Sequence, residues 1–331
     1  MHDPLLSVDD LNVSFTFEKK SVKAVDNVGF KVDREDFFAL VGESGSGKTL
    51  TALSIMRLLP PGAAFSGRIL FKGEDILIKS PEGLRRMRGR EISMIFQEPM
   101  TSLNPVFTVG FQVAEALSTH LDISRKEAMD RAIELIGSVK IPSPEIRVKE
   151  YPHQMSGGMR QRIMIAMAIA CDPALVIADE PTTALDVTIQ AQILELIGGL
   201  KRKNKMSILL ITHDLGIVAE WARRVEVMYA GRIVEKASVR DIFLEPRHPY
   251  TMGLLESLPK GKGEKLVPVP GQVPGLRELP PGCKFAPRCR YVIPACREKE
   301  PELIPVNTNL KNGGETGFPD HFSRCIRAME I

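Results

Sequence analysis

The sequence has no long hydrophobic run and no large excess of charge of either sign. No uninterrupted apolar stretch approaches the ~20 residues that a membrane-spanning helix needs. Lysine and arginine exceed aspartate and glutamate by 44 − 41 = +3, which is too small an excess to indicate nucleic-acid binding. The first four residues lack the basic and then apolar pattern of a signal peptide. We therefore expect a cytosolic protein that can contact a membrane protein without crossing the bilayer itself.

Cysteine is also scarce, with five residues in the chain. Cys171 lies alone in an apolar segment and is predicted to be a small buried hydrophobe. The other four follow the spacing C-x5-C-x6-C-x28-C near the end of the chain, and in a cytosolic protein such a group indicates a metal rather than disulfides. They are Cys283, Cys289, Cys296 and Cys325. Structural zinc sites usually contain C-x2–4-C pairs, so we rank an iron–sulfur cluster first, zinc second and free thiols third.

The hydrophobic pattern predicts an α/β fold. Residues 37–41 form a continuous apolar run, as in a central strand covered on both faces. A helical pattern follows over residues 50–59 and stops at Pro60. Further strands are predicted over 5–8, 11–15, 67–71, 91–96, 174–178 and 207–211. Because a helix of period 3.6 separates the last two strands, parallel strands and helices alternate in this core.

Two segments differ from this α/β pattern. Apolar residues recur at intervals of three and four over residues 107–170, which predicts a helical insertion. Proline and glycine are dense over residues 259–287, and regular periodicity is lost after residue 258. We expect this tail to build little core, so it needs cross-links, and the four cysteines are the candidates.

The segment from Gly42 to Thr49 fits the pattern G-x-x-x-x-G-K-[ST] and lies between a predicted strand and a predicted helix. Glycines allow backbone N–H groups to surround phosphate oxygens, and the start of the helix favours the same anion. Lys48 is predicted to neutralise phosphate charge, and Thr49 to coordinate Mg²⁺. The predicted nucleotide-binding set is Gly42, Glu43, Ser44, Gly45, Ser46, Gly47, Lys48, Thr49 and Leu50.

Two further motifs suit phosphate chemistry. An apolar strand ends at Asp179 and Glu180; the first is predicted to hold magnesium, and the second to orient or deprotonate an attacking water. Ser156 is a natural N-cap, and Gly157 and Gly158 after it allow close approach of an anion.

Together these motifs resemble those of ATP-binding cassette (ABC) proteins. Residues 155–162 are similar to the ABC signature motif, usually Leu-Ser-Gly-Gly-Gln, from which Met155 and Met159 depart. The resemblance covers about residues 5–245. It implies a RecA-like α/β core with an N-terminal antiparallel β subdomain, a helical subdomain at about 100–170 and a small cysteine-rich C-terminal extension. The implied domains are residues 1–250 and 251–331.

The resemblance also assigns roles to single residues. Gln97 resembles the Q-loop glutamine, which contacts Mg²⁺ and the γ-phosphate, and His213 resembles the switch histidine. Phe15 occupies the place of the aromatic that stacks on adenine, with Phe17 as a substitute. The run from Ala184 to Asp186 resembles the D-loop. In this family the signature serine of one cassette closes on the phosphate loop of another, so a chain with one of each implies a dimer, with itself or with a second ABC ATPase.

Three longer sequence segments resemble those of the ATPase subunits of dipeptide and oligopeptide importers. They are residues 97–105 (QEPMTSLNP), 180–188 (EPTTALDVT) and 248–251 (HPYT). This resemblance implies two membrane permease subunits, an external substrate-binding protein, a peripheral position on the cytoplasmic side of the membrane, and a 4Fe–4S cluster in the cysteine pattern. Nickel importers and some sugar importers share the subfamily.

Two other functions fit the sequence less well. ABC ATPases that act on DNA or ribosomes usually have two cassettes in one chain, long coiled-coil insertions or basic patches. This chain has one cassette, no heptad run and only 59 residues from Gln97 to Ser156. A cysteine-rich metal module on a degenerate nucleotide fold would require damaged catalytic positions, but Lys48, Asp179, Glu180 and His213 are all present.

Overall fold

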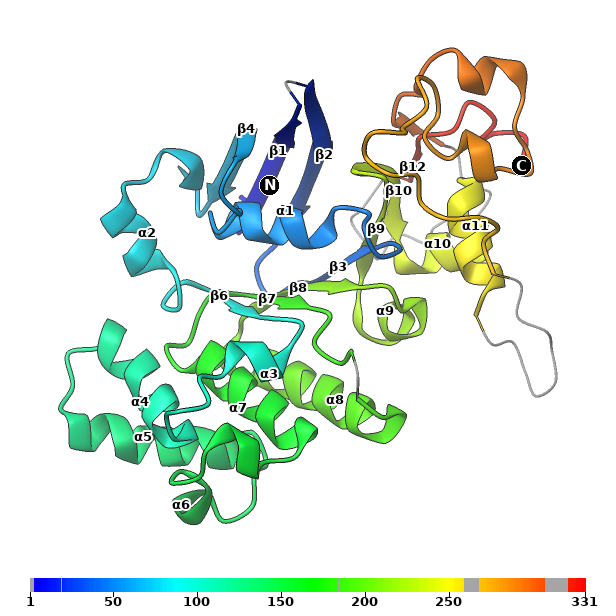
Figure 1. Cartoon of the computed structure of the whole chain (residues 1–331). Helices are drawn as coiled ribbons and strands as arrows, with labels where there is room; N and C mark the ends of the chain where they lie inside the picture. The colour runs from blue at the N-terminus through cyan, green and yellow to red at the C-terminus, as the bar shows by residue number, and fades with distance from the viewer. Residues whose placement is uncertain (1–2, 19, 184, 259–267, 307–320) are drawn as a thin grey trace. The chain divides into compact units, whose positions relative to one another are not determined.

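The computed structural model describes residues 3–18, 20–183, 185–258, 268–306 and 321–331 (Figure 1). The chain forms two compact units. Unit 1 comprises Met1–Leu5, Val32–Asp36 and Ile78–Leu210, and unit 2 comprises Leu6–Lys31, Phe37–Leu77 and Ile211–Ile331. None of the helices in the described ranges combines the length and apolar character needed to cross a membrane.

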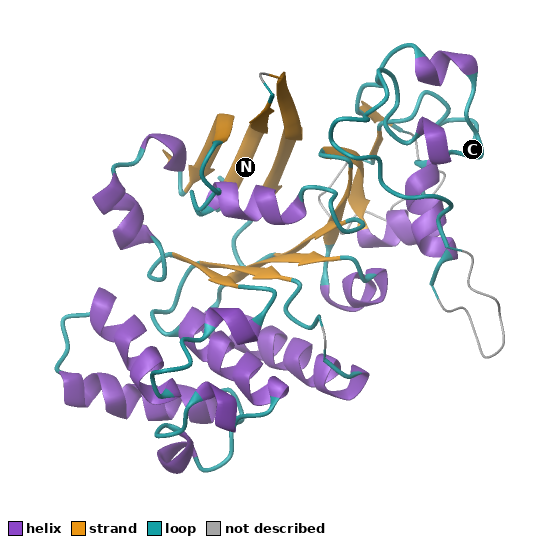
Figure 2. Cartoon of the chain, viewed as in Figure 1, coloured by secondary structure: helices purple, strands orange, loops and turns teal. Residues whose placement is uncertain are grey.

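Unit 1 is mainly helical (Figure 2). Several of its helices begin at a capping side chain: Thr108, Ser124, Ser156 and Asp186 each accept the backbone N–H three residues later. The helical insertion predicted over residues 107–170 is therefore confirmed as α4 to α7. The α-helices are α2 (Pro81–Met87), α3 (Pro99–Ser102), α4 (Val109–His120), α5 (Arg125–Ser138), α6 (Pro144–Arg147), α7 (Gly157–Ile169) and α8 (Val187–Asn204), with a 3-10 turn at Pro152–Gln154.

The strands of unit 1 confirm the predicted alternation. β6 (Ile92–Ile95) pairs in parallel with β7 (Leu175–Asp179), and β8 (Ser207–Thr212), most of which belongs to this unit, lies on the other side of β7. All three strands are fully buried along their length, as expected for parallel strands with both faces covered. β7 therefore lies between β6 and β8, and the chain continues from its carboxyl end toward α8.

Unit 2 begins with an antiparallel sheet in the order β2-β1-β4-β5, formed by β1 (Leu6–Phe17), β2 (Lys20–Val32), β4 (Ala63–Phe71) and β5 (Glu74–Asp75), with a 3-10 turn at Ile76–Ile78. The two strands predicted over 5–8 and 11–15 are one strand, because a bulge between Asp9 and Asn12 accommodates the polar interruption. Helix α1 (Lys48–Ile55) ends before residue 59, the predicted end, because Arg57 adopts a left-handed conformation (φ 48°).

Unit 2 contains a second set of paired strands. β3 (Phe37–Val41) pairs in parallel with β9 (Arg224–Tyr229), which forms a hairpin with β10 (Arg232–Ser238). β12 (Phe322–Ser323) joins β10, and β11 (Ile304–Pro305) joins β12. The accompanying helices are α9 (Leu215–Trp221), α10 (Val239–Leu244) and α11 (Pro249–Glu256), with 3-10 turns at Ala286–Arg288 and Pro294–Arg297.

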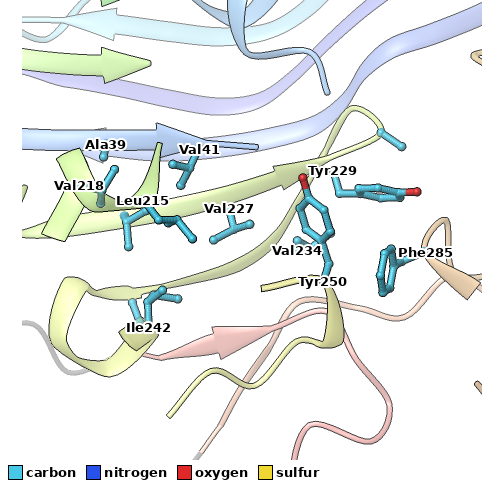
Figure 3. Packing of buried hydrophobic residues seen from close by; sticks show 13 residues of the cluster. Ala39, Val41, Leu215, Val218, Val227, Tyr229, Val234, Ile242, Tyr250 and Phe285 are labelled. Atoms are coloured by element: carbon cyan, nitrogen blue, oxygen red, sulfur yellow. The ribbon is translucent and has the colours of Figure 1, made fainter. Parts of the chain in front are cut away.

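The tail contributes to this core, contrary to the expectation that it builds little core of its own. Phe285 is 3% exposed, and its ring centroid lies 5.2 Å from that of Tyr229 and 5.4 Å from that of Tyr250 (Figure 3). Other tail residues pack against the same hydrophobic cluster: Val269, Val273, Leu279, Cys283 and Cys289. The physical reason is that isolated large side chains at irregular spacing fill the core without any periodic pattern. Residues 259–267 of the predicted tail lie outside the described residues.

Candidate functional site

The predicted phosphate loop, Gly42–Thr49, follows β3 directly, and close backbone contacts require its glycines. Gly45 and Gly47 have φ angles of 79° and 103°, which other residues adopt only with strain. A Cβ at Gly42 would lie 2.1 Å from the carbonyl oxygen of Met228, and a Cβ at Gly47 would lie 2.9 Å from that of Ala24. The loop therefore fits closely against the chain of unit 2 at both ends.

Lys48 lies at the start of α1, with its side chain folded back over the loop. Its Nζ donates to the carbonyl oxygen of Gly42 (2.7 Å), to that of Glu43 (3.0 Å) and to Ser46 Oγ (3.4 Å). The residue is 5% exposed, whereas Ser44 and Thr49 are exposed. This arrangement places an ammonium group and a helix start beside exposed backbone, which is a geometry suited to binding a polyphosphate.

In unit 1, Asp179 and Glu180 lie at the end of β7, as predicted. Asp179 is 2% exposed. The Glu180 carboxylate oxygen Oε2 accepts a hydrogen bond from Thr183 Oγ1 (2.8 Å) and one from Gln97 Nε2 (3.3 Å). Glu180 also has a φ of 45°, a strained conformation of the kind that recurs at functional sites. The structure thus brings the two candidate residues Gln97 and Glu180 into contact.

Thr183 is the residue of this cluster that the sequence analysis missed. Its hydroxyl reaches back three residues to Glu180, and hydroxyl side chains in turns commonly make such local bonds. The two threonines after Pro181 were the available signal.

The predicted signature segment forms the start of α7. Ser156 and Gly157 are exposed, and Ser156 Oγ accepts from the Met159 amide at 3.3 Å. A Cβ at Gly158 would lie 3.0 Å from Ile189 Cγ2 of α8, so glycine allows the two helices to approach closely. Asp186 caps α8, and the next residue, Val187, is 83% exposed. Ala184 lies outside the described residues.

Two further candidates lie in unit 2. His213 is exposed immediately after β8. Phe15 is half-buried on β1, and its ring centroid lies 6.4 Å from that of Phe17. The Arg277 guanidinium lies over the Phe17 ring at 4.7 Å, so Phe17 already has a cationic neighbour.

The four C-terminal cysteines all line one small cavity, of about 20 Å³. Burial raises the pKa of Cys283 to about 12 and that of Cys325 to about 11, which favours neutral thiols in the protein alone. Across the described ranges, no group of three or more His, Cys, Asp or Glu side chains is arranged to hold a metal ion. The four cysteines thus lie around one cavity, but their arrangement does not support the predicted cluster. The cavity has room for about one water molecule.

Cys171 is half-buried, so the prediction of a buried residue was wrong. Its thiol lies 3.7 Å from the carbonyl oxygen of Ala116, and a polar contact of this kind at the end of α7 does not require full burial.

Comparison with protein families gives two matches. Residues 25–183 match the family model described as ABC transporter, and residues 234–296 match the model described as oligopeptide/dipeptide transporter, C-terminal region.

Similar proteins match along nearly the whole chain. A putative peptide import ATP-binding protein of Brucella melitensis is 50% identical over 99% of this chain and 98% of its own length. A dipeptide transport ATP-binding protein of Haemophilus influenzae is 52% identical, covering 92% and 93% of the two chains. An oligopeptide transport ATP-binding protein of Bacillus subtilis is 53% identical, covering 91% and 93%.

Among solved structures, a dimeric ATP-binding cassette bound to ADP and phosphate superposes with a TM-score of 0.64. Its sequence identity is 24%, and the match covers 71% of this chain and 99% of that one. At this identity the likeness concerns the fold alone, and it agrees with the α/β core and helical segment described above.

Proposed function

The chain belongs to the ABC transporter ATP-binding proteins of peptide importers, and from that premise we propose that it hydrolyses ATP to energise the uptake of dipeptides or oligopeptides through a membrane permease. The observation that carries this function is identity of about half the residues, along nearly the full chain, with proteins named for peptide import. An ABC ATPase without a transport role is not favoured, because the relatives and the C-terminal region are those of importers. Nickel remains the alternative cargo within the subfamily.

The phosphate loop, Gly42 to Leu50, binds the nucleotide in this proposal. Lys48 neutralises phosphate charge, and Phe15 stacks on the base, since Phe17 is engaged by Arg277. Magnesium bound with the nucleotide would neutralise developing charge on the phosphates. The hydroxyl of Thr49, the amide of Gln97 and the carboxylate of Asp179 would supply the oxygen ligands that this ion prefers.

Hydrolysis is assigned to Glu180 and His213. The Glu180 carboxylate orients and deprotonates the attacking water, and its bonds with Thr183 and Gln97 fix its direction. His213 contacts the γ-phosphate. Ser156, Gly157 and Gly158 are exposed or half-exposed, and we assign them to the nucleotide held by a second ATPase subunit, identical or not.

Unit 1 also presents apolar side chains suited to protein partners. Val106 is 70% exposed, and the rings of Phe107 and Phe111, 44% and 43% exposed, lie 4.8 Å apart. Such a patch supports docking to another protein. We propose two permease subunits as these partners, with an extracytoplasmic substrate-binding protein acting through them.

The chain would then lie peripherally on the cytoplasmic side of the membrane, with no role for nucleic acid. The proposed domains remain residues 1–250 and 251–331.

The transport function is tested by purifying the chain from native membranes. We expect two permease subunits to accompany it, and the reconstituted complex to take up labelled dipeptides or oligopeptides only with ATP on the side of this chain. Lys48→Ala should abolish uptake and leave the complex assembled. Accumulation of nickel without peptide, or isolation of the chain with DNA or ribosomes, would overturn the assigned cargo or the transport role.

We further propose that Cys283, Cys289, Cys296 and Cys325 hold a 4Fe–4S cluster, with zinc as the alternative metal. Support comes from the spacing of the four cysteines and from their position around one cavity. Because the described side chains are not arranged around a metal ion, binding of the cluster would have to rearrange them. Protein purified without oxygen is expected to be brown and to contain iron, and Cys296→Ser should lose both properties. Cys171→Ser, which changes a cysteine in unit 1, should keep them. Colourless protein with bound zinc, or with no metal, would contradict the cluster.

A further inference from the structure

The C-terminal segment supplies an arginine to the phosphate loop. Arg288 Nη1 lies 2.7 Å from Glu43 Oε2, and Nη2 lies 3.0 Å from Glu43 Oε1, so the pair is bidentate. The Arg288 side chain is 4% exposed and that of Glu43 is 30% exposed. The partners are 245 positions apart in the sequence and both lie in unit 2.

Arg288 is held firmly by its surroundings. Its Nε donates to the carbonyl oxygen of Pro270 at 2.7 Å. Its guanidinium also lies 5.7 Å and 5.8 Å from the ring centroids of Tyr229 and Phe285. The cation is therefore placed by the core of unit 2, and Glu43 meets a fixed partner.

Glu43 connects this arginine to the lysine of the loop. Its backbone N–H donates to Tyr250 Oη at 2.8 Å, and its carbonyl oxygen accepts from Lys48 Nζ at 3.0 Å. Tyr250 is fully buried beside Phe285 (Figure 3). One loop residue is thus held at its amide, its carbonyl and its carboxylate.

A second connection runs from the same segment. Lys284 Nζ donates to the carbonyl oxygen of Ala230 at 3.0 Å and pairs with Asp26 at 3.4 Å. The next residue of that turn, Gly231, donates its N–H to the carbonyl oxygen of Ser46 at 2.9 Å. The segment containing Lys284 and Arg288 therefore reaches the loop from two directions.

We propose that Arg288 is a positioning residue for nucleotide binding, which acts by neutralising and fixing the Glu43 carboxylate within the phosphate loop. The proposal rests on the proposed function, because it takes the loop to bind ATP. Its consequence is that ATP affinity depends on the C-terminal extension being in place.

The physical reason is electrostatic. A polyphosphate carries several negative charges, and an uncompensated carboxylate in the binding loop repels them. Arg288 removes this repulsion and keeps the carboxylate turned toward the C-terminal segment. Without Arg288, the same carboxylate is free to compete with the phosphates for Lys48. A glutamine at position 43 would carry no such charge, so the need for Arg288 would disappear with it.

The test is titration of the purified full chain with a fluorescent ATP analogue and Mg²⁺. Arg288→Ala is expected to weaken binding about five- to tenfold. On a Glu43→Gln background, adding Arg288→Ala should change the affinity by less than about twofold relative to Glu43→Gln alone. Arg290→Ala is the matched control, because it breaks another bidentate pair of the same segment, with Glu256, and should leave binding unchanged.

The salt dependence of ATP binding distinguishes loss of charge neutralisation at Glu43 from a general loss of structure. The deficit of Arg288→Ala should shrink at high ionic strength, because salt screens the exposed part of Glu43. If Arg288→Ala weakens binding as much in the Glu43→Gln background as in the wild type, the proposal is overturned. Wild-type affinity in Arg288→Ala would overturn it as well. If Arg288→Ala shows no cooperative melting, Arg288→Gln, which can keep a hydrogen bond to Pro270, takes its place in the same comparison. Absence of binding by the wild type would instead defeat the proposed function.

Discussion

Glu180→Gln is expected to bind Mg-ATP with nearly wild-type affinity and to hydrolyse it about 10²- to 10⁴-fold more slowly, the range for loss of a general base. Glutamine has the shape of glutamate, but it cannot take a proton from water at neutral pH. The residues assigned to binding, in the phosphate loop and at Asp179, are unchanged. Steady-state phosphate release and equilibrium nucleotide binding, measured on the same preparation, check both halves of this expectation.

The geometry around Glu180 indicates that this substitution changes the charge of the side chain without disturbing the local structure. The amide oxygen of glutamine can still accept the Thr183 hydroxyl, which bonds the wild-type carboxylate at 2.8 Å. The backbone strain at position 180 is also the same for both residues. Loss of rate is therefore expected without loss of fold.

Glu195→Gln, an exposed position on α8, is the matched control and should keep full activity. Full activity in Glu180→Gln would contradict the assigned role and transfer it to another group. Equal loss of binding and hydrolysis would show instead that Glu180 serves the nucleotide directly.

The parts of the site that the sequence predicted are those carried by short contiguous segments. The strand, loop and helix around the candidate phosphate loop could be predicted because an apolar run, glycines at fixed spacing and a helical pattern follow one another. Asp179 and Glu180 could be recognised because they end a strand that is buried on both faces. In each case the local chain both forms the element and positions the functional group.

The parts that the sequence analysis missed depend on contacts between distant positions. Arg288 meets Glu43 across 245 residues, and no local pattern at either residue indicates the other. The core around Phe285 was also missed, because an irregular segment buries single large side chains without periodicity. That error affected the argument for metal: a tail with its own buried contacts and ion pairs does not need a cross-link to be ordered.

A further prediction concerns the proposed division of the ATP site between two subunits. Lys48→Ala and Ser156→Asp are each expected to lose at least about 10²-fold in ATPase activity as pure preparations, since each removes or opposes a contact with phosphate. Aspartate is a good N-cap, so Ser156→Asp preserves the start of α7 while it places a negative charge against the nucleotide. Ser124→Asp changes the N-cap of α5 in the same way and should have no effect.

Mixing the two inactive variants distinguishes a shared site from a self-contained one. In a mixed dimer, the intact loop of the Ser156→Asp chain meets the intact signature of the Lys48→Ala chain, so one of two sites is complete. Random pairing then restores about a quarter of wild-type activity. The variant that carries both substitutions should give the opposite result when it is mixed with wild type. Each mixed dimer then has one defect in each of its two sites, so the double variant should lower the ATPase activity of the wild-type protein. If each site lay within one chain, the mixture of Lys48→Ala with Ser156→Asp would stay inactive. The mixture of the double variant with wild type would then keep the full activity of the wild-type protein in it. A signature that acts only on a different ATPase would leave both mixtures, and the wild type alone, without activity, so the same assay also separates self-pairing from a mixed pair.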